Sequence, residues 1–278
     1  MGILGQLETT SPPDQLYHYT SFQGFIGITA SRSIWASSIH HLNDAEEFAH
    51  GRRLVQNEIQ ERRRSIRDQS EDDFMSLLWS RIEQIRGAHV FVASFSQDND
   101  LLSQWRGYCP SGKGISVGIG SDILEERGKA QGFRLVPAIY DHEDQQAVVR
   151  ELIDQAVSSR STGRIEDDPL SQHFAYQVAT ISPLLKHATF REEKEWRLVS
   201  RITSIDHPQV RVREGQSRII PYFDFTLAKD GEPLHLRDLK IGPSPLPQLA
   251  SEGVWAALRV SKTIAQSTTV SSVPYRAW

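Results

Sequence analysis

The stretch Arg191-Glu192-Glu193-Lys194-Glu195-Trp196-Arg197-Leu198-Val199 places two carboxylates two positions apart in a segment that otherwise has the composition of a β-strand. Successive side chains of a strand point to opposite faces of its sheet. Glu193, Glu195 and Arg197 are therefore expected on one face, and the apolar Trp196 on the other. Neighbouring acids repel each other unless a cation or a ligand offsets them. The stretch predicts either a solvated strand face that Arg197 neutralises or a chemical site.

Short apolar and β-branched runs predict the rest of a sheet around this stretch. The strands are expected at residues 16–20, 34–37, 90–96, 115–119, 133–140, 219–225, 234–241 and 270–273. Apolar residues at helical spacing predict helices at residues 22–28, 43–64, 71–86, 101–108, 143–158, 169–187 and 246–258, with Asn43 and Ser70 as N-caps. Residues 1–14 are expected to form a flexible leader, and residues 15–278 a single α+β domain with helical insertions.

The composition is that of an ordinary globular protein, since 38% of the 278 residues are hydrophobic and 24% are charged. The net charge of −4 gives no reason to expect broad binding to nucleic acid, although it leaves room for local basic clusters. A single cysteine, Cys109, excludes an intrachain disulfide and a thiolate metal cluster. The first residues lack the pattern of a secretory signal, and no apolar run is long enough for a membrane-spanning helix. We therefore expect a cytoplasmic protein without membrane partners.

Four segments concentrate side chains that are able to carry chemistry. They are His18-Tyr19-Thr20, Asn43-Asp44 with Glu47, Ser94-Phe95-Ser96 with Trp105 and Tyr108, and Glu193 to Arg197. Each segment also has a structural interpretation: a structural histidine, a helix cap, or small hydroxyls that relieve packing in a buried strand. Trp105 and Tyr108 are three positions apart, so they are expected on one side of a helical turn. They either pack in the core or form a platform for a base or nicotinamide ring.

Other chemistries find little support. The sequence contains no complete Walker loop, no G-x-G-x-x-G and no H-E-x-x-H motif. His40 and His41 are adjacent and cannot both face a metal from one regular helix, so no metal is expected. Cys109 lacks a local signature of a nucleophile. The run Arg62-Arg63-Arg64 is typical of the solvated end of a helix.

At these segments the chain resembles a known family. The motifs Leu16-Tyr17-His18-Tyr19-Thr20, Asn43-Asp44 with Glu47, Ser94-Phe95-Ser96 with Trp105 and Tyr108, and Lys194-Glu195-Trp196-Arg197 are similar to those of the bacterial domain-of-unknown-function 2971 family. Ile241-Gly242-Pro243 and Pro274-Tyr275-Arg276 resemble the end of that family. The resemblance covers nearly the whole chain.

That family is in turn similar, more distantly, to the ADP-ribosyltransferase fold, which implies a mixed or antiparallel split β-sheet core. In such enzymes a histidine or arginine of the first core strand holds the ribose of NAD, a second strand surrounds the nicotinamide, and a later strand carries the catalytic glutamate. The resemblance implies Glu195 and Glu193 as catalytic residues and, as contacts to NAD, His18, Tyr19, Thr20, Ser94, Phe95, Ser96, Trp105, Tyr108 and Arg197. Trp105 and Tyr108 depart from the usual tyrosine pattern around the nicotinamide.

The chemistry of NAD cleavage agrees with these residue types. Breaking the nicotinamide–ribose bond develops positive charge on the sugar, as in glycoside hydrolysis. An ionised Glu195 would stabilise that charge, Arg197 would keep Glu195 ionised, and Glu193 would orient the acceptor or take its proton. We therefore expect a transferase that moves ADP-ribose from NAD, its substrate, to a protein or nucleic acid. The resemblance adds a toxin or phage-defence role and an inhibitory partner protein.

Two alternatives stay open. One is an NAD hydrolase, in which water is the acceptor. The other is a nucleotide-sensing or interaction module that kept the cleft and lost turnover.

Overall fold

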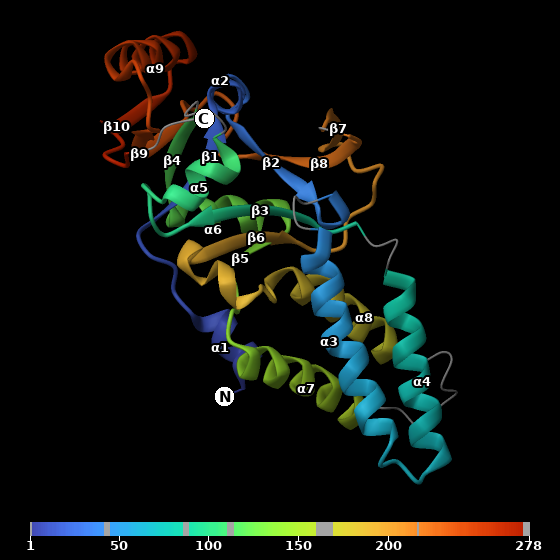
Figure 1. Ribbon diagram of the computed structural model, residues 1–278. Coiled ribbons are helices and arrows are strands. Elements are labelled where there is room, and N and C mark those ends of the chain that lie inside the picture. Colours follow the sequence, from blue (N-terminus) through green and yellow to red (C-terminus); the bar gives the residue numbers. More distant parts are fainter. Residues whose placement is uncertain are drawn as a thin grey trace.

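The computed structural model describes residues 2–41, 45–85, 89–109, 114–159, 169–215 and 217–274 (Figure 1). The strands are β1 (Gln15–Ser21), β2 (Ser33–Ser38), β3 (Phe91–Ser96), β4 (Gly114–Gly120), β5 (Phe133–Pro137), β6 (Glu195–Ser200), β7 (Val210–Glu214), β8 (Ile219–Thr226), β9 (His235–Ile241) and β10 (Ile264–Val270). The α-helices are α1 (Ile3–Thr9), α2 (Phe22–Ser31), α3 (Ala45–Arg63), α4 (Gln69–Gln84), α5 (Leu102–Tyr108), α6 (Ser121–Gln131), α7 (His142–Ser158), α8 (Pro169–Ile181) and α9 (Pro247–Ser261). Short 3-10 helices occur at η1 (Ile39–His41), η5 (Ser182–Leu184) and η6 (Ala188–Glu193).

All these strands belong to one mixed sheet in which antiparallel pairing dominates. The main path runs β10-β9-β4-β1-β3-β2-β8-β7, β6 also pairs with β3, and β5 pairs with β6. The pair β9–β10 is parallel, whereas the other described strand pairs are antiparallel. The expected α+β class with a mixed, mainly antiparallel sheet is therefore confirmed.

The sheet forks at β3. Ser96 pairs with Tyr17 of β1 and with Glu195 of β6, while Val92 pairs with Ser37 of β2 and also with β6. Because β6 occupies one edge of β3 along its length, β1 and β2 must share the other edge, each at one end. Figure 1 shows β1 and β2 diverging above β3. The fork explains how one short strand lies beside three neighbours.

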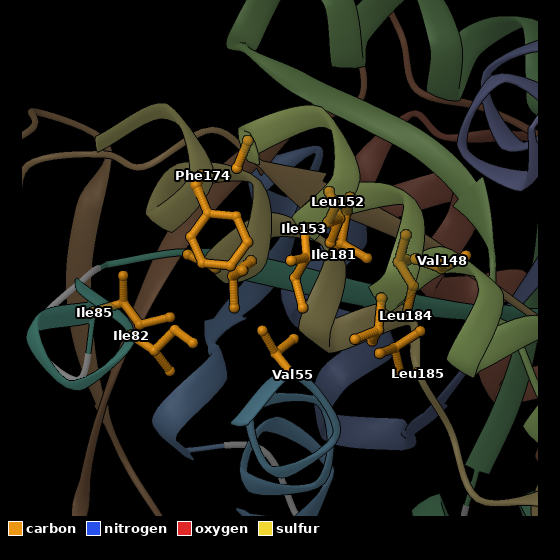
Figure 2. Close-up of a cluster of buried hydrophobic side chains, with 14 of the residues drawn as sticks. Val55, Ile82, Ile85, Val148, Leu152, Ile153, Phe174, Ile181, Leu184 and Leu185 are labelled. Atoms are coloured by element: carbon orange, nitrogen blue, oxygen red, sulfur yellow. The ribbon is translucent and has the colours of Figure 1, made fainter. Parts of the chain in front are cut away.

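Two hydrophobic cores lie on the two faces of the sheet. One, the four-helix core, is built from α3, α4, α7 and α8 against Val92, Val136 and Val199 (Figure 2). The other, the three-helix core, joins α2, α6 and α9 to apolar strand residues such as Phe95 and Trp196. The β3 residues that face the four-helix core alternate along the strand with those that face the three-helix core. A strand that is buried on both faces requires this alternation.

The segment expected to be a flexible leader contains a helix, α1. Ile3, Leu4 and Leu7 are partly buried against the four-helix core, and the Leu4 amide donates to Glu151 of α7 at 3.2 Å. Apolar residues at these spacings give a short helix one packing face. The beginning of the described chain is therefore attached to the helical layer.

Other differences from the expected elements have local causes. α4 is capped by Asp68, whose carboxylate accepts from the Glu71 amide at 2.9 Å, rather than by Ser70. The last strand runs over Ile264–Val270 rather than 270–273, and its polar Gln-Ser-Thr-Thr run hides the strand pattern. α6 and β7 lie outside the elements that the sequence pattern predicts. α6 buries few apolar side chains, and β7 is largely exposed, so neither has a clear hydrophobic period.

Candidate functional site

β6 begins later than the alternation of its sequence implies. Residues Ala188–Glu193 form η6, and Lys194 follows with a φ of 42° in the left-handed region. The chain therefore turns before Glu195 enters β6. The prediction that Glu193 shares a strand face with Glu195 and Arg197 is wrong for Glu193, because Glu193 precedes the strand. Glu195 and Arg197 do share a face of β6.

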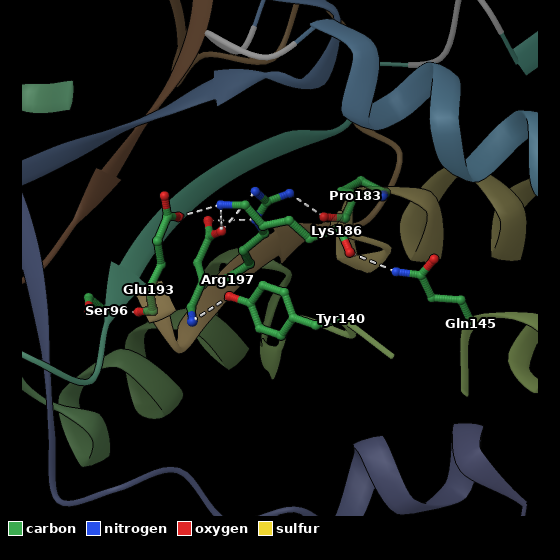
Figure 3. A network of polar contacts seen from close by, with 8 residues as sticks. Ser96, Tyr140, Gln145, Pro183, Lys186, Glu193 and Arg197 are labelled. Atoms are coloured by element: carbon green, nitrogen blue, oxygen red, sulfur yellow. Dashed lines mark hydrogen bonds and ion pairs between the residues drawn. The ribbon is translucent and has the colours of Figure 1, made fainter. Parts of the chain in front are cut away.

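Glu195 and Arg197 are the centre of a buried group of charges. Arg197 Nε donates to Glu195 Oε1 at 2.7 Å, and Arg197 Nη2 donates to Glu195 Oε2 at 3.0 Å. The ammonium group of Lys186 donates to Oε2 of both Glu193 and Glu195. We call Lys186, Glu193, Glu195 and Arg197 the ion-pair cluster (Figure 3). Its two cations balance two carboxylates, which is what allows these charges to be buried.

Burial in the cluster is nearly complete at its centre. Glu195 and Lys186 are each 4% exposed and Arg197 is 2% exposed, whereas the side chain of Glu193 is 13% exposed. Glu193 is thus the member of the cluster nearest to solvent.

Arg197 also contacts a main-chain carbonyl. Its Nη1 donates to the carbonyl oxygen of Pro183 in η5. Helix α3 packs against η5 at Gly51, where an added Cβ would lie 2.7 Å from the Cβ and 2.8 Å from the Cα of Ser182. The missing side chain of Gly51 therefore lets α3 support the segment that holds Arg197.

The segment that carries Lys186 is also held by its backbone. Leu185 forms a parallel bridge with Ile139, and the Lys186 amide donates to the Ile139 carbonyl at 3.0 Å. The buried side-chain amide of Gln145 donates to the carbonyls of Ile139 at 2.7 Å and Lys186 at 2.8 Å. These bonds connect α7 to the position of the ammonium group.

The cluster keeps Glu195 ionised. Burial by itself raises the pKa of this carboxyl, but Arg197 and Lys186 outweigh burial through charge and hydrogen bonds, and the pKa falls to about 2. At neutral pH Glu195 therefore bears a negative charge whose two oxygens are both engaged.

Two tyrosines lie close to this charge. Tyr140 Oη accepts from the Glu195 amide at 2.9 Å, and burial together with the neighbouring Glu195 raises the pKa of Tyr140 to about 12. Desolvation and the same carboxylate raise the pKa of Tyr108 to about 12, although Tyr108 remains 40% exposed. Both phenols are protonated at neutral pH and are able to donate a hydrogen bond.

The serine-bearing strand lies directly beside the cluster. Ser96 pairs with Glu195 and Ser94 with Arg197 across β3 and β6, so these four residues share one face of the sheet. Ser96 Oγ donates to the Glu193 carbonyl at 2.7 Å and accepts from the Asp98 amide at 3.1 Å. Phe95 points to the opposite face, into the three-helix core.

His18 lies at the fork rather than over the cluster. Tyr17 pairs with Ser96, so Tyr17 and Tyr19 belong to the Glu195 face of β1, and alternation assigns His18 and Thr20 to the other. The ring nitrogen Nδ1 of His18 lies 3.0 Å from the Ser94 carbonyl, and the ring packs against Phe95 at 5.7 Å. Burial lowers the pKa of His18, which is consistent with a neutral ring that donates to this carbonyl.

Trp105 and Tyr108 of α5 separate into a core residue and an accessible one. Trp105 is 0% exposed, donates from Nε1 to Asp100 at 2.8 Å, and packs edge-on against Tyr19 at 4.7 Å. It therefore presents no face to a ligand. Cys109 is equally buried, and burial raises the pKa of its thiol to about 12, which makes it a poor nucleophile.

A groove of about 960 Å³ opens beside β1. Its lining includes Tyr17, Gln97, Asp122, Arg237 and Gln266, and none of the ion-pair cluster. Tyr17 and Gln97 connect the groove to the neighbourhood of the ion-pair cluster. Tyr17 pairs with Ser96, and the Gln97 amide donates to the Lys194 carbonyl at 3.3 Å.

The predicted positions Asn43, Asp44 and Glu47 have no described side chains. Asn43 and Asp44 are outside the described residues, and nothing is described for the side chain of Glu47 within α3. No group of three or more histidine, cysteine, aspartate or glutamate residues suited to a metal occurs within the described ranges. The helices of the described chain are also too short or too polar to cross a bilayer.

Three groups at the site were not predicted from the sequence: Lys186, Tyr140 and the Pro183 carbonyl. A lysine that ends the apolar run Pro183-Leu184-Leu185 was a usable signal, since a lysine in apolar surroundings is rarely buried without a carboxylate partner.

Residues 104–198 match the model of a family described as a protein of unknown function, DUF2971. This part of the chain is similar to the DUF2971 family. The DUF2971 match contains Tyr108, Tyr140 and the whole ion-pair cluster, and it confirms the predicted family. Neither the curated proteins nor the solved structures that were searched contain a match.

Proposed function

We propose that this protein is an ADP-ribosyltransferase-like enzyme that cleaves NAD at the nicotinamide–ribose bond and transfers ADP-ribose to a macromolecular acceptor. The observation that carries the proposal is the position of Glu195, a buried and ionised carboxylate directly across from Ser96. β3 separates β6 from β1, so the strands that bear Glu195, the serines and His18 are consecutive in the sheet.

The proposed reaction uses the charge of Glu195. The bond between nicotinamide and C1′ of the ribose breaks, its electron pair leaves with the nicotinamide, and positive charge develops on the sugar. Glu195 stabilises that charge. Lys186 occupies Oε2 of Glu195 in this structure, so the ammonium group shifts when the sugar binds. The acceptor then attacks C1′ and gives its proton to the more exposed Glu193.

A second candidate function, nucleotide binding without cleavage, follows from the contacts of Glu195, whose carboxylate already has cationic partners. Both oxygens of Glu195 accept hydrogen bonds from cations, a pattern that also suits a purely structural ion pair. In that case the protein binds a nucleotide without cleaving it. The alternative with water as acceptor differs from transfer in its product.

Purified protein incubated with NAD should release nicotinamide, which chromatography detects directly. Glu195→Gln should reduce the release by at least about a hundredfold, because it removes the charge that stabilises the transition state. Radiolabelled ADP-ribose retained on protein or nucleic acid identifies transfer, whereas free ADP-ribose identifies hydrolysis.

The matched control is Glu126→Gln on α6. This change removes a carboxylate from an exposed ion pair with Lys229. It should release nicotinamide at the wild-type rate. Assays are run below the unfolding temperature of each variant, so that loss of folding is separated from loss of chemistry. Nicotinamide release that is absent from the wild type, or equal in Glu195→Gln, would reject the proposed reaction.

A further inference from the structure

The outer face of β2, β8 and β7 carries an exposed aromatic ring in the middle of a sheet. Trp35 of β2 is 46% exposed, and its ring contacts Tyr222 of β8 with centroids 4.9 Å apart. Strand positions between two neighbours are usually covered when they bear a tryptophan. A half-exposed tryptophan supported from the side by a second ring is a ready surface for stacking.

Two arginines of β7 lie on the same face of the sheet as this ring, and one of them contacts it. The Arg213 guanidinium lies 5.4 Å from the centre of the Trp35 ring, and its Nη2 donates to Ser37 Oγ at 3.2 Å. Its Nε is buried without a hydrogen-bond partner, and burial lowers the pKa of Arg213. Arg211 is two residues earlier on the same face of β7, with its side chain 61% exposed and Asp224 at 3.7 Å. We call Trp35, Tyr222, Arg211 and Arg213 the aromatic–arginine patch.

Strand register places this patch on the Glu195 face of the sheet. Ser37 pairs with Tyr222 and with Val92, and Val92 pairs with Val199 of β6, so all four side chains share a face. Because Val199 and Glu195 are four residues apart on β6, they point the same way. The patch and the ion-pair cluster therefore lie on the same face, on different sides of the fork.

One more cation, Arg218, lies near the point where β2 ends. Burial lowers the pKa of His41, and the charged groups that lower it further are Arg218, His40 and His89. His41 Nδ1 is buried without a hydrogen-bond partner. Arg218 thus extends the positive charge beyond β2 in a chain whose net charge is −4.

We propose that the aromatic–arginine patch binds single-stranded nucleic acid, with a base stacked on Trp35 and the phosphates held by Arg211 and Arg213. Base–aromatic stacking beside a basic track is the common design of proteins that hold single strands. Alternate residues of a strand lie roughly 7 Å apart, so Arg211 and Arg213 are able to contact successive phosphates of an extended strand.

A single strand fits better than other partners. An apolar protein surface would leave both arginines desolvated, and a duplex keeps its bases stacked inside and unavailable to Trp35. The patch is a separate site from the ion-pair cluster, so this inference does not depend on cleavage of NAD.

The test is fluorescence anisotropy with labelled oligothymidylate and oligouridylate of about 12 nucleotides, a length within known single-strand site sizes. Wild-type protein should bind, and its affinity should fall steeply between about 50 and 200 mM salt. The double variant Trp35→Ala/Arg213→Gln should weaken binding at least about tenfold. Arg211→Gln, at an exposed position, should lower the slope of log affinity against log salt by about one. DNA and RNA probes show which sugar is preferred.

The matched control is Trp255→Ala/Arg259→Gln on α9, which removes an exposed tryptophan and an exposed arginine at the other end of the sheet (Figure 1). It should bind like the wild type. Thermal unfolding shows whether each variant is folded. If the double variant Trp35→Ala/Arg213→Gln does not fold, the exposed Arg211→Gln variant still tests the proposal. Absence of binding by the wild type, an unchanged salt slope in Arg211→Gln, or equal losses in patch and control variants would overturn the proposal.

Discussion

Arg197 organises the candidate site at the scale of single residues. Its three guanidinium nitrogens bind both oxygens of Glu195 and the carbonyl of Pro183, so one side chain joins β6 to η5. Such a fork of donors is specific to arginine, since lysine offers a point charge. Lys186 supplies that point charge and shares it between two carboxylates.

The ion pairs predict how stability depends on pH. The pKa of Glu195 falls from 4.5 to about 2 in the folded protein, so its stabilisation is complete above pH 4.5 and is lost as the pH falls toward 2. A shift of this size corresponds to about 3 kcal/mol of unfolding free energy. Urea unfolding measured across this pH range should show a steeper loss in the wild type than in Glu195→Gln.

Glu195→Gln should also be less stable than the wild type at neutral pH by about 3 kcal/mol or more, because two buried cations lose their partner. Glu126→Gln should retain the pH dependence of the wild type, since its carboxylate is exposed. Parallel curves for the wild type and Glu195→Gln would mean that the cluster does not hold Glu195 ionised.

At the scale of elements, the contact between α3 and η5 supports the ion-pair cluster through the Pro183 carbonyl that Arg197 binds. Gly51 packs closely against Ser182 of η5, and η5 carries the carbonyl that Arg197 binds. A side chain at this position has to push α3 away from Ser182, whose backbone is not free to move without disturbing Pro183. The helical layer and the cluster are thus mechanically connected.

Gly51→Ala should therefore destabilise the protein by about 1–3 kcal/mol, even though alanine favours helices, because the added methyl overpacks a backbone contact. Gly253→Ala in α9 is the control, since nothing lies within 4 Å of the added Cβ. It should stabilise the protein by up to about 1 kcal/mol. Denaturant unfolding measures both variants, and equal signs for the two changes would contradict the role given to Gly51.

Elements with a clear hydrophobic period were predictable from sequence, and those without one were not. β1, β3, β4, α5 and α7 appear close to their expected residues because apolar side chains repeat at strand or helix spacing. β7 and β10 are polar edge strands, and α6 buries little, so the sheet around them determines their structure. The left-handed turn at Lys194 was also invisible, because alternation alone continued the strand back to Glu193.

The candidate site was predictable only in part for a similar reason. Sequence patterns selected Glu195, Ser96 and Tyr108, which the fold brings near one another. Lys186 and Tyr140 lie in segments without a motif, and tertiary contacts alone place them at Glu195. The face occupied by His18 depends on strand register at the fork, which no local pattern specifies.

For the whole molecule, the sheet separates the two hydrophobic cores. Its central strands are expected to be better protected from hydrogen exchange than its end strands. β3 and β6 pair on both edges and are buried on both faces, whereas β7 pairs with β8 and β10 with β9 at the ends of the path. Local opening requires fewer broken contacts at the ends.

Hydrogen exchange followed by mass spectrometry should therefore show the slowest amides in β3 and β6 and the fastest strand amides in β7 and β10. Strand β4, which also pairs on both edges, is the internal reference for a protected strand. Exchange in β6 as fast as in β10 would show that the region around Glu195 opens independently of the rest of the sheet.

The single ammonium group between Glu193 and Glu195 has one further consequence. Whatever withdraws Lys186, whether a bound sugar or a chemical modification that neutralises the amine, removes the cation that bridges the two carboxylates and leaves Arg197 bound to Glu195. Their repulsion would drive the side chain of the more exposed Glu193 away from Glu195 and toward solvent. The charge of Lys186 therefore holds the end of η6 beside the start of β6, and loss of that charge should loosen the contact.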